Sequence, residues 1–369
     1  MLFILGTRPE AIKLCPVIQC LRGAPDFAVS VCATAQHREM LDQVLALFGV
    51  EPEHDLGVMR EGQTLYQASA AILAGLEQVM AAEKPDLVVV QGDTTTTLCG
   101  ALAGFYARAP VGHVEAGLRT RNRYRPFPEE MNRVLVTQLS TLHFAATEWA
   151  ANNLRAEGVR EEQIALTGNP GIDAVLSVAR RLEAGELTVE RSWTSGAGRK
   201  LIAVTAHRRE SFGAGFVGIC EALRRLAKRA DVEIVYPVHP NPNVRGPVLE
   251  RLGGAPGIRL IPPLDYLAFV DLMRSAYLLL TDSGGVQEEG PSLGKPVLVM
   301  REETERPEAV EAGTARLVGT DPEQIVREVE LLVEDEREWA RRAQIRNPYG
   351  DGLASGRILA AMRRYFAGG

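Results

Sequence analysis

Short apolar runs of strand length alternate along the chain with segments whose apolar residues recur at helical spacing. The segment "REMLDQVLALFG" (38–49) is one such helical pattern. In the first half, strands are predicted at residues 2–5, 29–33, 87–90, 111–114, 142–145 and 164–166. In the second half, they are predicted at residues 201–204, 233–236, 258–261, 277–280, 296–299 and 315–318. This rhythm is typical of parallel sheets covered by helices on both faces.

The number of strands and the length of the chain both indicate two domains. The 369 residues are too many for one typical hydrophobic core. We expect an N-terminal α/β domain at residues 1–170 and a C-terminal one at residues 171–351. The last helix, at about 352–369, is expected to pack back onto the first domain. The fold class is therefore α/β, with two doubly wound parallel sheets and a cleft between the domains.

The composition narrows the class of protein without identifying it. A formal net charge of −6, with 46% hydrophobic and 24% charged residues, is typical of a soluble globular protein and argues against nucleic-acid binding. No apolar run approaches the roughly 20 residues that span a bilayer, and the N-terminus does not resemble a signal peptide. The five cysteines form no CxxC pair and the six histidines form no metal-binding pattern. We expect a cytoplasmic protein that binds no metal, membrane or nucleic acid.

Polar residues gather where the predicted strands end. The sequences that follow the strands include "GTRPEAIK" (6–13), "GDTTTT" (92–97), "EAGLRT" (115–120), "TAHRRE" (205–210), "VHPNP" (238–242) and "TDSGG" (281–285). A solvated loop would explain one such turn, but not a series spread over both halves. Because ligands of open α/β sheets bind beyond the carboxyl ends of the strands, these turns predict a cleft lined with acids, bases and hydrogen-bond donors.

Two of these turns have features of an anion site. Arg8 and Lys13 flank a predicted helix start, where backbone amides favour an anion, although surface charges that cap a helix would give the same pattern. In "TDSGGVQEEG" (281–290), the glycines let a phosphate approach the backbone, and Glu288 or Glu289 could accept ribose hydroxyls. Neither turn is a GxGxxG or P-loop motif, so the pattern favours a nucleoside diphosphate over a dinucleotide.

Carboxylates from three separate segments could supply acid and base groups. Asp93 and Glu115 follow neighbouring strands, and Glu129 begins a helix on which Arg133 lies four residues later. A simple surface pair between Glu129 and Arg133 is the alternative. Glu130, next to this pair, is expected to be solvated or structural.

The ordered set of motifs resembles the non-hydrolysing UDP-N-acetylglucosamine 2-epimerase family over nearly the whole chain. The motifs are "GTRPEAIKLCPV", "TAQHREMLDQVL", "VQGDTTTT", "GHVEAGLRT", "PFPEEMNR", "TAHRRESFG", "YPVHPNP", "TDSGGVQEEGPSLGKPVLVMR" and "TERPEAVEAGT". The resemblance implies two Rossmann-like domains in the glycosyltransferase-B arrangement. It also implies interconversion of UDP-GlcNAc and UDP-ManNAc, without a cofactor, by anti elimination of UDP to 2-acetamidoglucal and re-addition.

The resemblance also assigns catalytic roles. Asp93, Glu115 and Glu129 would be the catalytic carboxylates, and which of them removes and which returns the C2 proton stays open. Arg133 would lie near the sugar and orient Glu129. His207 would stabilise the departing UDP as a hydrogen-bond donor or proton shuttle.

Further positions would bind nucleotide. The residues that would hold UDP are Arg8, Lys13, His239, Phe269 against the uracil, Ser283, Gly284, Gly285, Glu289 and Arg306. Arg208 would support the diphosphate or the acids. A second UDP-GlcNAc activates many members at a site that would include Gln36, Glu39 and Arg208, but Gly62 stands where some members carry an arginine.

The resemblance further implies a homodimer that supplies ManNAc units for a cell-surface polysaccharide. Three other functions stay open at this point. A hydrolysing 2-epimerase would release ManNAc and UDP, a glycosyltransferase of the same fold would transfer the sugar without inversion at C2, and a UDP-sugar sensor would not turn over.

Overall fold

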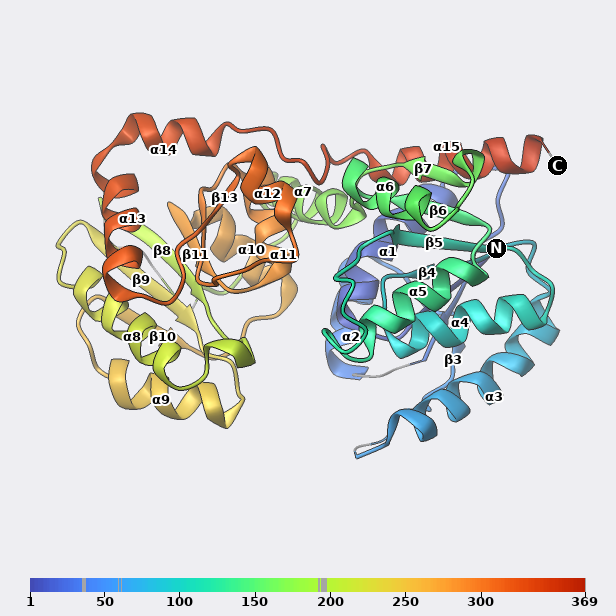
Figure 1. Cartoon of the computed structure of the whole chain (residues 1–369), viewed down its shortest axis with the longest axis horizontal. Coiled ribbons are helices and arrows are strands. Elements are labelled where there is room, and N and C mark those ends of the chain that lie inside the picture. Colours follow the sequence, from blue (N-terminus) through green and yellow to red (C-terminus); the bar gives the residue numbers. More distant parts are fainter. Residues whose placement is uncertain (35–37, 59, 61, 192, 194–197, 369) are drawn as a thin grey trace. The chain divides into compact units, whose positions relative to one another are not determined.

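The computed structural model describes residues 1–34, 38–58, 60, 62–191, 193 and 198–368. They form two compact units, Met1–Ala174 with Tyr349–Gly369 and Val175–Pro348 (Figure 1). Each unit is built on its own parallel sheet, one of seven strands and one of six. The fold class predicted from the sequence, two doubly wound α/β domains, is confirmed.

The sheet of the N-terminal unit has the order β3-β2-β1-β4-β5-β6-β7, and all of its strand pairs are parallel. Its strands are β1 (Leu2–Leu5), β2 (Ser30–Ala33), β3 (His54–Asp55), β4 (Val88–Gln91), β5 (Val111–Ala116), β6 (Leu142–Ala145) and β7 (Ile164–Leu166). Its helices are α1 (Arg8–Arg22), α2 (Arg38–Leu47), α3 (Leu65–Glu83), α4 (Thr95–Tyr106), α5 (Glu129–Leu139), α6 (Glu148–Ala156) and α15 (Ala354–Ala367). A 3-10 turn, η1 (Glu161–Gln163), precedes β7.

Helices cover both faces of this sheet because its strands are apolar on both sides. The side chains of Leu2 and Ile4 share a buried cluster with residues of α3 and α4, while α1 packs with α2 and α15 (Figure 1). Two contacts fasten the C-terminal helix to this unit. Arg363 pairs with Asp26 at 2.7 Å, and the carboxylate of Asp173 accepts the backbone N–H groups of residues 354 and 355.

The sheet of the C-terminal unit has the order β10-β9-β8-β11-β12-β13, again entirely parallel. Its strands are β8 (Lys200–Thr205), β9 (Val232–Pro237), β10 (Ile258–Ile261), β11 (Leu278–Thr281), β12 (Val297–Val299) and β13 (Ala315–Leu317). The helices that follow α7 (Pro170–Glu183) are α8 (Ala214–Leu226), α9 (Pro242–Leu252), α10 (Tyr266–Ser275), α11 (Gly284–Glu289), α12 (Pro307–Ala312), α13 (Pro322–Glu334) and α14 (Glu336–Ala343). The 3-10 turns are η2 (Arg209–Ser211) and η3 (Gly290–Leu293).

Both sheets have a topological switch point, where the strand order reverses direction. It lies between β1 and β4 in the N-terminal unit and between β8 and β11 in the C-terminal unit. The turns that leave these strands carry "GTRPE", "GDTTTT", "TAHRRE" and "TDSGG". Ligands of doubly wound folds bind at switch points, so the topology alone singles out these four turns.

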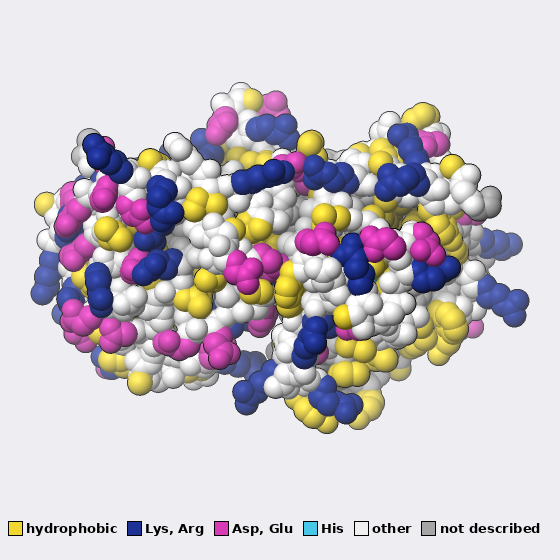
Figure 2. Space-filling view, turned by 45° about the horizontal axis from the view of Figure 1, so that its top comes forward, with side chains coloured by type: hydrophobic (Ala, Val, Ile, Leu, Met, Phe, Trp, Pro, Cys, Tyr) yellow, Lys and Arg dark blue, Asp and Glu magenta, His cyan; other side chains and the backbone are white. Residues whose placement is uncertain are grey.

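The strands predicted from the apolar runs are all present, and no end is shifted by more than two residues. The sequence pattern missed β3, since its two residues, His54 and Asp55, are polar. No helix among the described residues is long and apolar enough to cross a membrane. On the face shown in Figure 2, basic side chains are interspersed with acidic ones over each unit.

Candidate functional site

The turn after β1 is shaped by a close contact and a helix cap. A Cβ atom on Gly6 would lie 2.2 Å from the hydroxyl oxygen of Thr34 and 2.4 Å from that of Thr96, so only glycine fits. Thr7 caps α1, and its side chain accepts the backbone N–H of Glu10 while the Glu10 carboxylate accepts that of Thr7. Arg8 is the first residue of the helix, as expected for a residue near an anion.

Glu10 joins this turn to the turn after β4. The carboxylate is 1% exposed and accepts the backbone N–H groups of Gly6 at 3.0 Å and Thr7 at 2.6 Å. Its other oxygen accepts the hydroxyls of Thr94 at 2.6 Å and Thr97 at 3.1 Å. Burial raises the pKa of Glu10, and these hydrogen bonds oppose that effect. Glu10 was not among the residues predicted from the sequence, although the T-x-x-E capping box was a readable signal.

Glu115 has an uncommon backbone conformation, and three donors bind its carboxylate. Its φ is +64°, and the pairing of β5 with β6 shifts register between residues 114 and 116. Its carboxylate accepts the Lys13 ammonium at 2.5 Å, the Gln91 amide, and the Asn169 amide at 3.4 Å. Non-glycine residues in the left-handed region cluster at functional sites, which supports Glu115 as a candidate.

Asp93 and Arg133 form an ion pair across two elements. The Arg133 guanidinium lies 2.7 Å from Oδ2 of Asp93 and also donates to Glu130 at 3.0 Å. The side chain of Asn132 donates to the backbone oxygen of Asp93 at 2.7 Å. Among the described residues, no hydrogen bond or ion pair joins Arg133 to Glu129, the partner that helical spacing suggests.

Glu130 is structural rather than solvated. It is 2% exposed and accepts the backbone N–H groups of Thr120 and Arg121 as well as the Arg133 guanidinium. Burial would raise the pKa of Glu130, but these donors hold it below its ordinary value. Glu130 thereby fixes the start of α5 and the loop before it.

Glu129 differs from the other candidate carboxylates. It begins α5, one turn before Arg133, and its Oε2 is buried without a hydrogen-bond partner among the described residues. A buried carboxylate oxygen without a donor is costly, so a group that needs an acceptor would be bound there.

His113 forms a hydrogen bond to the backbone of the turn that carries Asp93. Its ring is fully buried, and Nε2 lies 2.7 Å from the backbone oxygen of Gly92, so the ring donates there. Burial lowers the pKa of His113 to about 3, which keeps the ring neutral. The sequence pattern did not single out His113, because it lies inside a strand rather than at its end.

In the C-terminal unit, two histidines from neighbouring turns stack on each other. His207 follows β8 and His239 follows β9, and their ring centroids are 5.3 Å apart with the planes inclined by 18°. Arg208 donates its backbone N–H to Asp282, and its side-chain Nε is buried without a hydrogen-bond partner among the described residues. Glu210 pairs with Arg301.

The other switch-point turn of this unit gathers most of the remaining predicted nucleotide residues. A Cβ atom on Gly284 would lie 3.4 Å from the Arg306 guanidinium carbon. A Cβ atom on Gly285 would lie 3.9 Å from both the Glu289 carboxylate and the Ser283 hydroxyl. Arg306 pairs with Glu288 at 2.6 Å. Phe269 lies in α10 and is half-buried.

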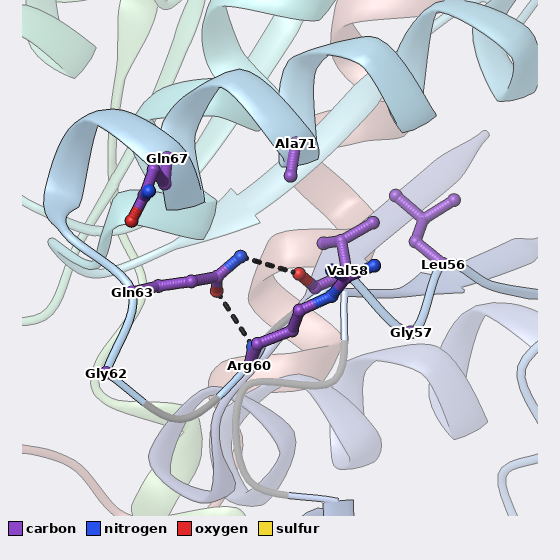
Figure 3. A pocket seen from close by; sticks show the side chains of 8 residues that line it. All are labelled: Leu56, Gly57, Val58, Arg60, Gly62, Gln63, Gln67 and Ala71. Atoms are coloured by element: carbon purple, nitrogen blue, oxygen red, sulfur yellow. Dashed lines mark hydrogen bonds between the residues drawn. The ribbon is translucent and has the colours of Figure 1, made fainter.

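The predicted activator residues are only partly within the described structure. Gln36 and the side chain of Glu39 lie outside the described residues, and Arg208 belongs to the C-terminal unit. Gly62 lines a pocket in the N-terminal unit, together with Leu56, Gly57, Val58, Arg60, Gln63, Gln67 and Ala71 (Figure 3). In it, the Gln63 amide donates to the backbone oxygen of Val58 at 3.0 Å and accepts the backbone N–H of Arg60 at 2.9 Å.

Comparisons with known proteins agree on one group of relatives. A family model described as UDP-N-acetylglucosamine 2-epimerase matches residues 19–363. A Salmonella typhimurium protein named UDP-N-acetylglucosamine 2-epimerase is 53% identical over 370 residues, which are 99% of this chain and 98% of that protein.

Solved structures agree with this match. The crystal structure of UDP-GlcNAc 2-epimerase from Neisseria meningitidis bound to UDP-GlcNAc has 46% identity and a TM-score of 0.91, covering 98% of this chain and 99% of that one. The Methanocaldococcus jannaschii UDP-GlcNAc 2-epimerase in complex with UDP-GlcNAc and UDP has 33% identity and a TM-score of 0.77, with coverage of 98% and 99%.

Proposed function

Because the chain belongs to the UDP-N-acetylglucosamine 2-epimerase family, we propose that it interconverts UDP-GlcNAc and UDP-ManNAc without hydrolysis. The proposed reaction is an anti elimination of UDP, which gives 2-acetamidoglucal, followed by re-addition of UDP to the same intermediate. Relatives solved with UDP-GlcNAc or UDP bound support the substrate class.

The chemistry of the sugar explains why several acids are needed. The C2 proton is not next to a carbonyl group, so it is hardly acidic in the free sugar. It becomes removable as the bond from C1 to the diphosphate oxygen breaks and C1 gains positive charge. The C2–H electron pair then forms the C1–C2 double bond, the C1–O pair leaves with UDP, and a protein base takes the proton. Inversion requires that the proton return to the opposite face.

The observation that carries this proposal is the difference among the three candidate carboxylates. Asp93 is paired with Arg133, and Glu115 accepts hydrogen bonds from Lys13 and two amides. The buried Oε2 of Glu129 has no hydrogen-bond donor among the described residues. Carboxylates in different surroundings can divide the roles of acid and base, which a reaction with separate deprotonation and reprotonation needs.

The C-terminal unit is proposed to hold the nucleotide and to assist its departure. His207 and His239 would lie beside the diphosphate, with Ser283, Gly284, Gly285, Glu289 and Arg306 around UDP and Phe269 against the uracil. Arg8 is the proposed contact from the N-terminal unit, and Lys13, expected from the sequence to be a second one, is instead paired with Glu115. In this assignment, cations and N–H donors stabilise the negative charge that develops on the leaving group.

Proton NMR with UDP-GlcNAc in D2O, without added NAD, tests the reaction directly. Non-hydrolysing epimerisation gives UDP-ManNAc with deuterium at C2. Free ManNAc and UDP would assign the chain to the hydrolysing 2-epimerases, and unchanged substrate would leave a transferase or a sensor. Asp93→Asn is the matched inactive control, since it removes one carboxylate and keeps the shape of the side chain.

The remaining expectations are proposed on the family assignment. The protein would be a cytoplasmic homodimer that supplies ManNAc units for a cell-surface polysaccharide. Phe105 and Tyr106 at the end of α4 are more than half exposed, which is compatible with a second copy on this face. Sedimentation equilibrium would measure the oligomeric state, and a sigmoidal dependence of the rate on UDP-GlcNAc would reveal an activator site.

A further inference from the structure

His207, which is proposed to assist the departure of UDP, lies next to a fully buried acid. β8 and β11 pair in parallel, with Thr205 opposite Thr281, so the residues that follow them enter the same switch point. Asp282 is 0% exposed, and its own backbone N–H donates to the backbone oxygen of Thr205 at 3.0 Å. The pairing of the two strands therefore places the Asp282 side chain under the turn that carries His207.

One oxygen of Asp282 holds the backbone of this turn. Oδ2 accepts the N–H of His207 at 2.6 Å and that of Arg208 at 2.7 Å. Two backbone donors at these distances fix the position of the carboxylate. The turn and the orientation of the acid are thus fixed by the same pair of hydrogen bonds.

The other oxygen of Asp282 points to the imidazole. Oδ1 is buried and has no hydrogen-bond partner among the described residues, yet it lies 3.5 Å from Nδ1 of His207. A buried carboxylate oxygen needs a donor. A small rotation of the partly exposed ring would complete a hydrogen bond from Nδ1–H to Oδ1.

From this geometry we propose that Asp282 is a positioning residue that keeps the proton of His207 on Nδ1 and stabilises the imidazolium, so that Nε2 faces the reacting group. The catalytic role of His207 rests on the proposed function, whereas the pairing of Asp282 with His207 does not. In the elimination, an imidazolium held in this way donates a hydrogen bond from Nε2 to the departing diphosphate oxygen. The C1–O electron pair leaves with UDP and the C2 proton goes to a carboxylate.

The charged neighbours of His207 act in different directions. Asp282, from the turn after β11, favours the imidazolium. His239, from the turn after β9, stacks on the ring and opposes a second positive charge when it is itself protonated. Arg208, the next residue, also opposes it, while Glu210 is paired with Arg301. The buried carboxylate of Asp282 therefore offsets the two neighbours that disfavour the cation.

Asp282 could instead have a purely structural role, in which Oδ2 only holds the backbone of the turn. Asp282→Asn separates the two roles. The amide oxygen of asparagine can still accept the two backbone N–H groups, which keeps the turn. Its NH2 group then faces Nδ1 and requires an unprotonated Nδ1, which forces the opposite tautomer.

The test combines nitrogen NMR of selectively labelled histidine with kinetics. In the unaltered protein above the pKa of His207, we expect the Nδ1–H tautomer, with His207→Gln used to assign the signal. In Asp282→Asn, we expect the pKa of His207 to fall by about one unit or more and kcat to fall about 100-fold or more, while UDP affinity changes less than about threefold. Asp321→Asn, which alters the cap of α13 in the same unit, is the matched control and should change neither.

Two results would overturn the inference. One is an Nε2–H tautomer of His207 in the unaltered protein, which decides the matter even if Asp282→Asn does not fold. The other is an unchanged His207 titration in folded Asp282→Asn. If the NMR results hold but the unaltered protein does not epimerise UDP-GlcNAc, the pairing of Asp282 with His207 stands and the proposed function fails.

Discussion

Lys13 gives a sharp test, because two roles for it predict different measurements. The sequence places Lys13 near an anion and suggests a contact with the diphosphate. In the structure its ammonium lies 2.5 Å from the Glu115 carboxylate, with side chains only 16% and 12% exposed. The structure therefore indicates that Lys13 acts mainly on a candidate catalytic carboxylate. Lys13→Met removes the charge and keeps most of the aliphatic side chain.

The expected loss of stability follows from the burial of this pair. Breaking a buried ion pair on one side costs roughly 3–5 kcal/mol. Here the Gln91 and Asn169 amides still donate to Glu115 after the substitution, and both side chains of the pair retain some exposure. We therefore expect a loss of about 2 kcal/mol, below that range. For a unit of this size, this lowers the unfolding midpoint by roughly 4–8 °C.

Three measurements on Lys13→Met distinguish the roles. If Lys13 acts on Glu115, the midpoint of thermal unfolding falls by the amount given above and kcat falls. The Kd for UDP, measured by calorimetry, then changes less than about threefold, which is about 0.7 kcal/mol. The control is Lys84→Met, an exposed lysine at the end of α3 in the same unit, which should leave all three unchanged. A loss of UDP affinity of tenfold or more, with an unchanged unfolding midpoint, would refute this reasoning and make Lys13 a phosphate ligand.

Substitutions at three further residues test other parts of the site. Asp93→Asn should abolish turnover and leave UDP affinity within about tenfold, or about 1.4 kcal/mol, by calorimetry; a much larger loss would show that Asp93 holds UDP. Since Glu115 has φ of +64°, Glu115→Gly should be more stable than Glu115→Ala by about 1 kcal/mol in urea unfolding, and the reverse order would contradict the left-handed backbone. Burial lowers the pKa of His113 to about 3 and that of His143 to about 4, so their contribution to stability is complete above about pH 6.5 and is lost as the pH falls toward those values. His113→Gln, which keeps a donor for Gly92, should flatten the decline of urea-unfolding stability between pH 6.5 and 5, and an equally steep decline would argue that His113 is not buried as a neutral ring.

The sequence predicts the strands well because their signal is local. Each apolar run is long enough to be recognised without knowledge of its neighbours. The order in which the strands pair, and with it the position of the switch points, is seen only in the folded sheets. The strand β3 is not predicted because its two polar residues, His54 and Asp55, carry no apolar pattern. These two residues form a strand because they pair with β2, and that pairing exists only in the folded sheet.

Site residues can be nominated from the sequence, but their partners cannot. Helical spacing suggests Glu129 as the partner of Arg133, whereas the guanidinium pairs with Asp93, forty positions earlier in the chain. Glu10 is readable as a capping residue, yet its bonds to Thr94 and Thr97 cross 84 and 87 positions. The contacts of Glu10 are set by the parallel pairing of β1 with β4, which brings the ends of these two strands together.

The two sheets have a switch point at the same place in their strand order but differ in chemistry, and much of the difference lies near the strand ends. At the switch point of the N-terminal unit, the turns hold carboxylates whose neighbours are cations and amides. At the equivalent point of the C-terminal unit, they hold histidine, arginine and glycine over a buried aspartate. Because the same strand order supports both sets, the fold fixes where a ligand binds but not what is done to it. Substitutions of the apolar strand residues should therefore alter stability, whereas substitutions of the polar residues at or just beyond the strand ends should alter catalysis or nucleotide affinity.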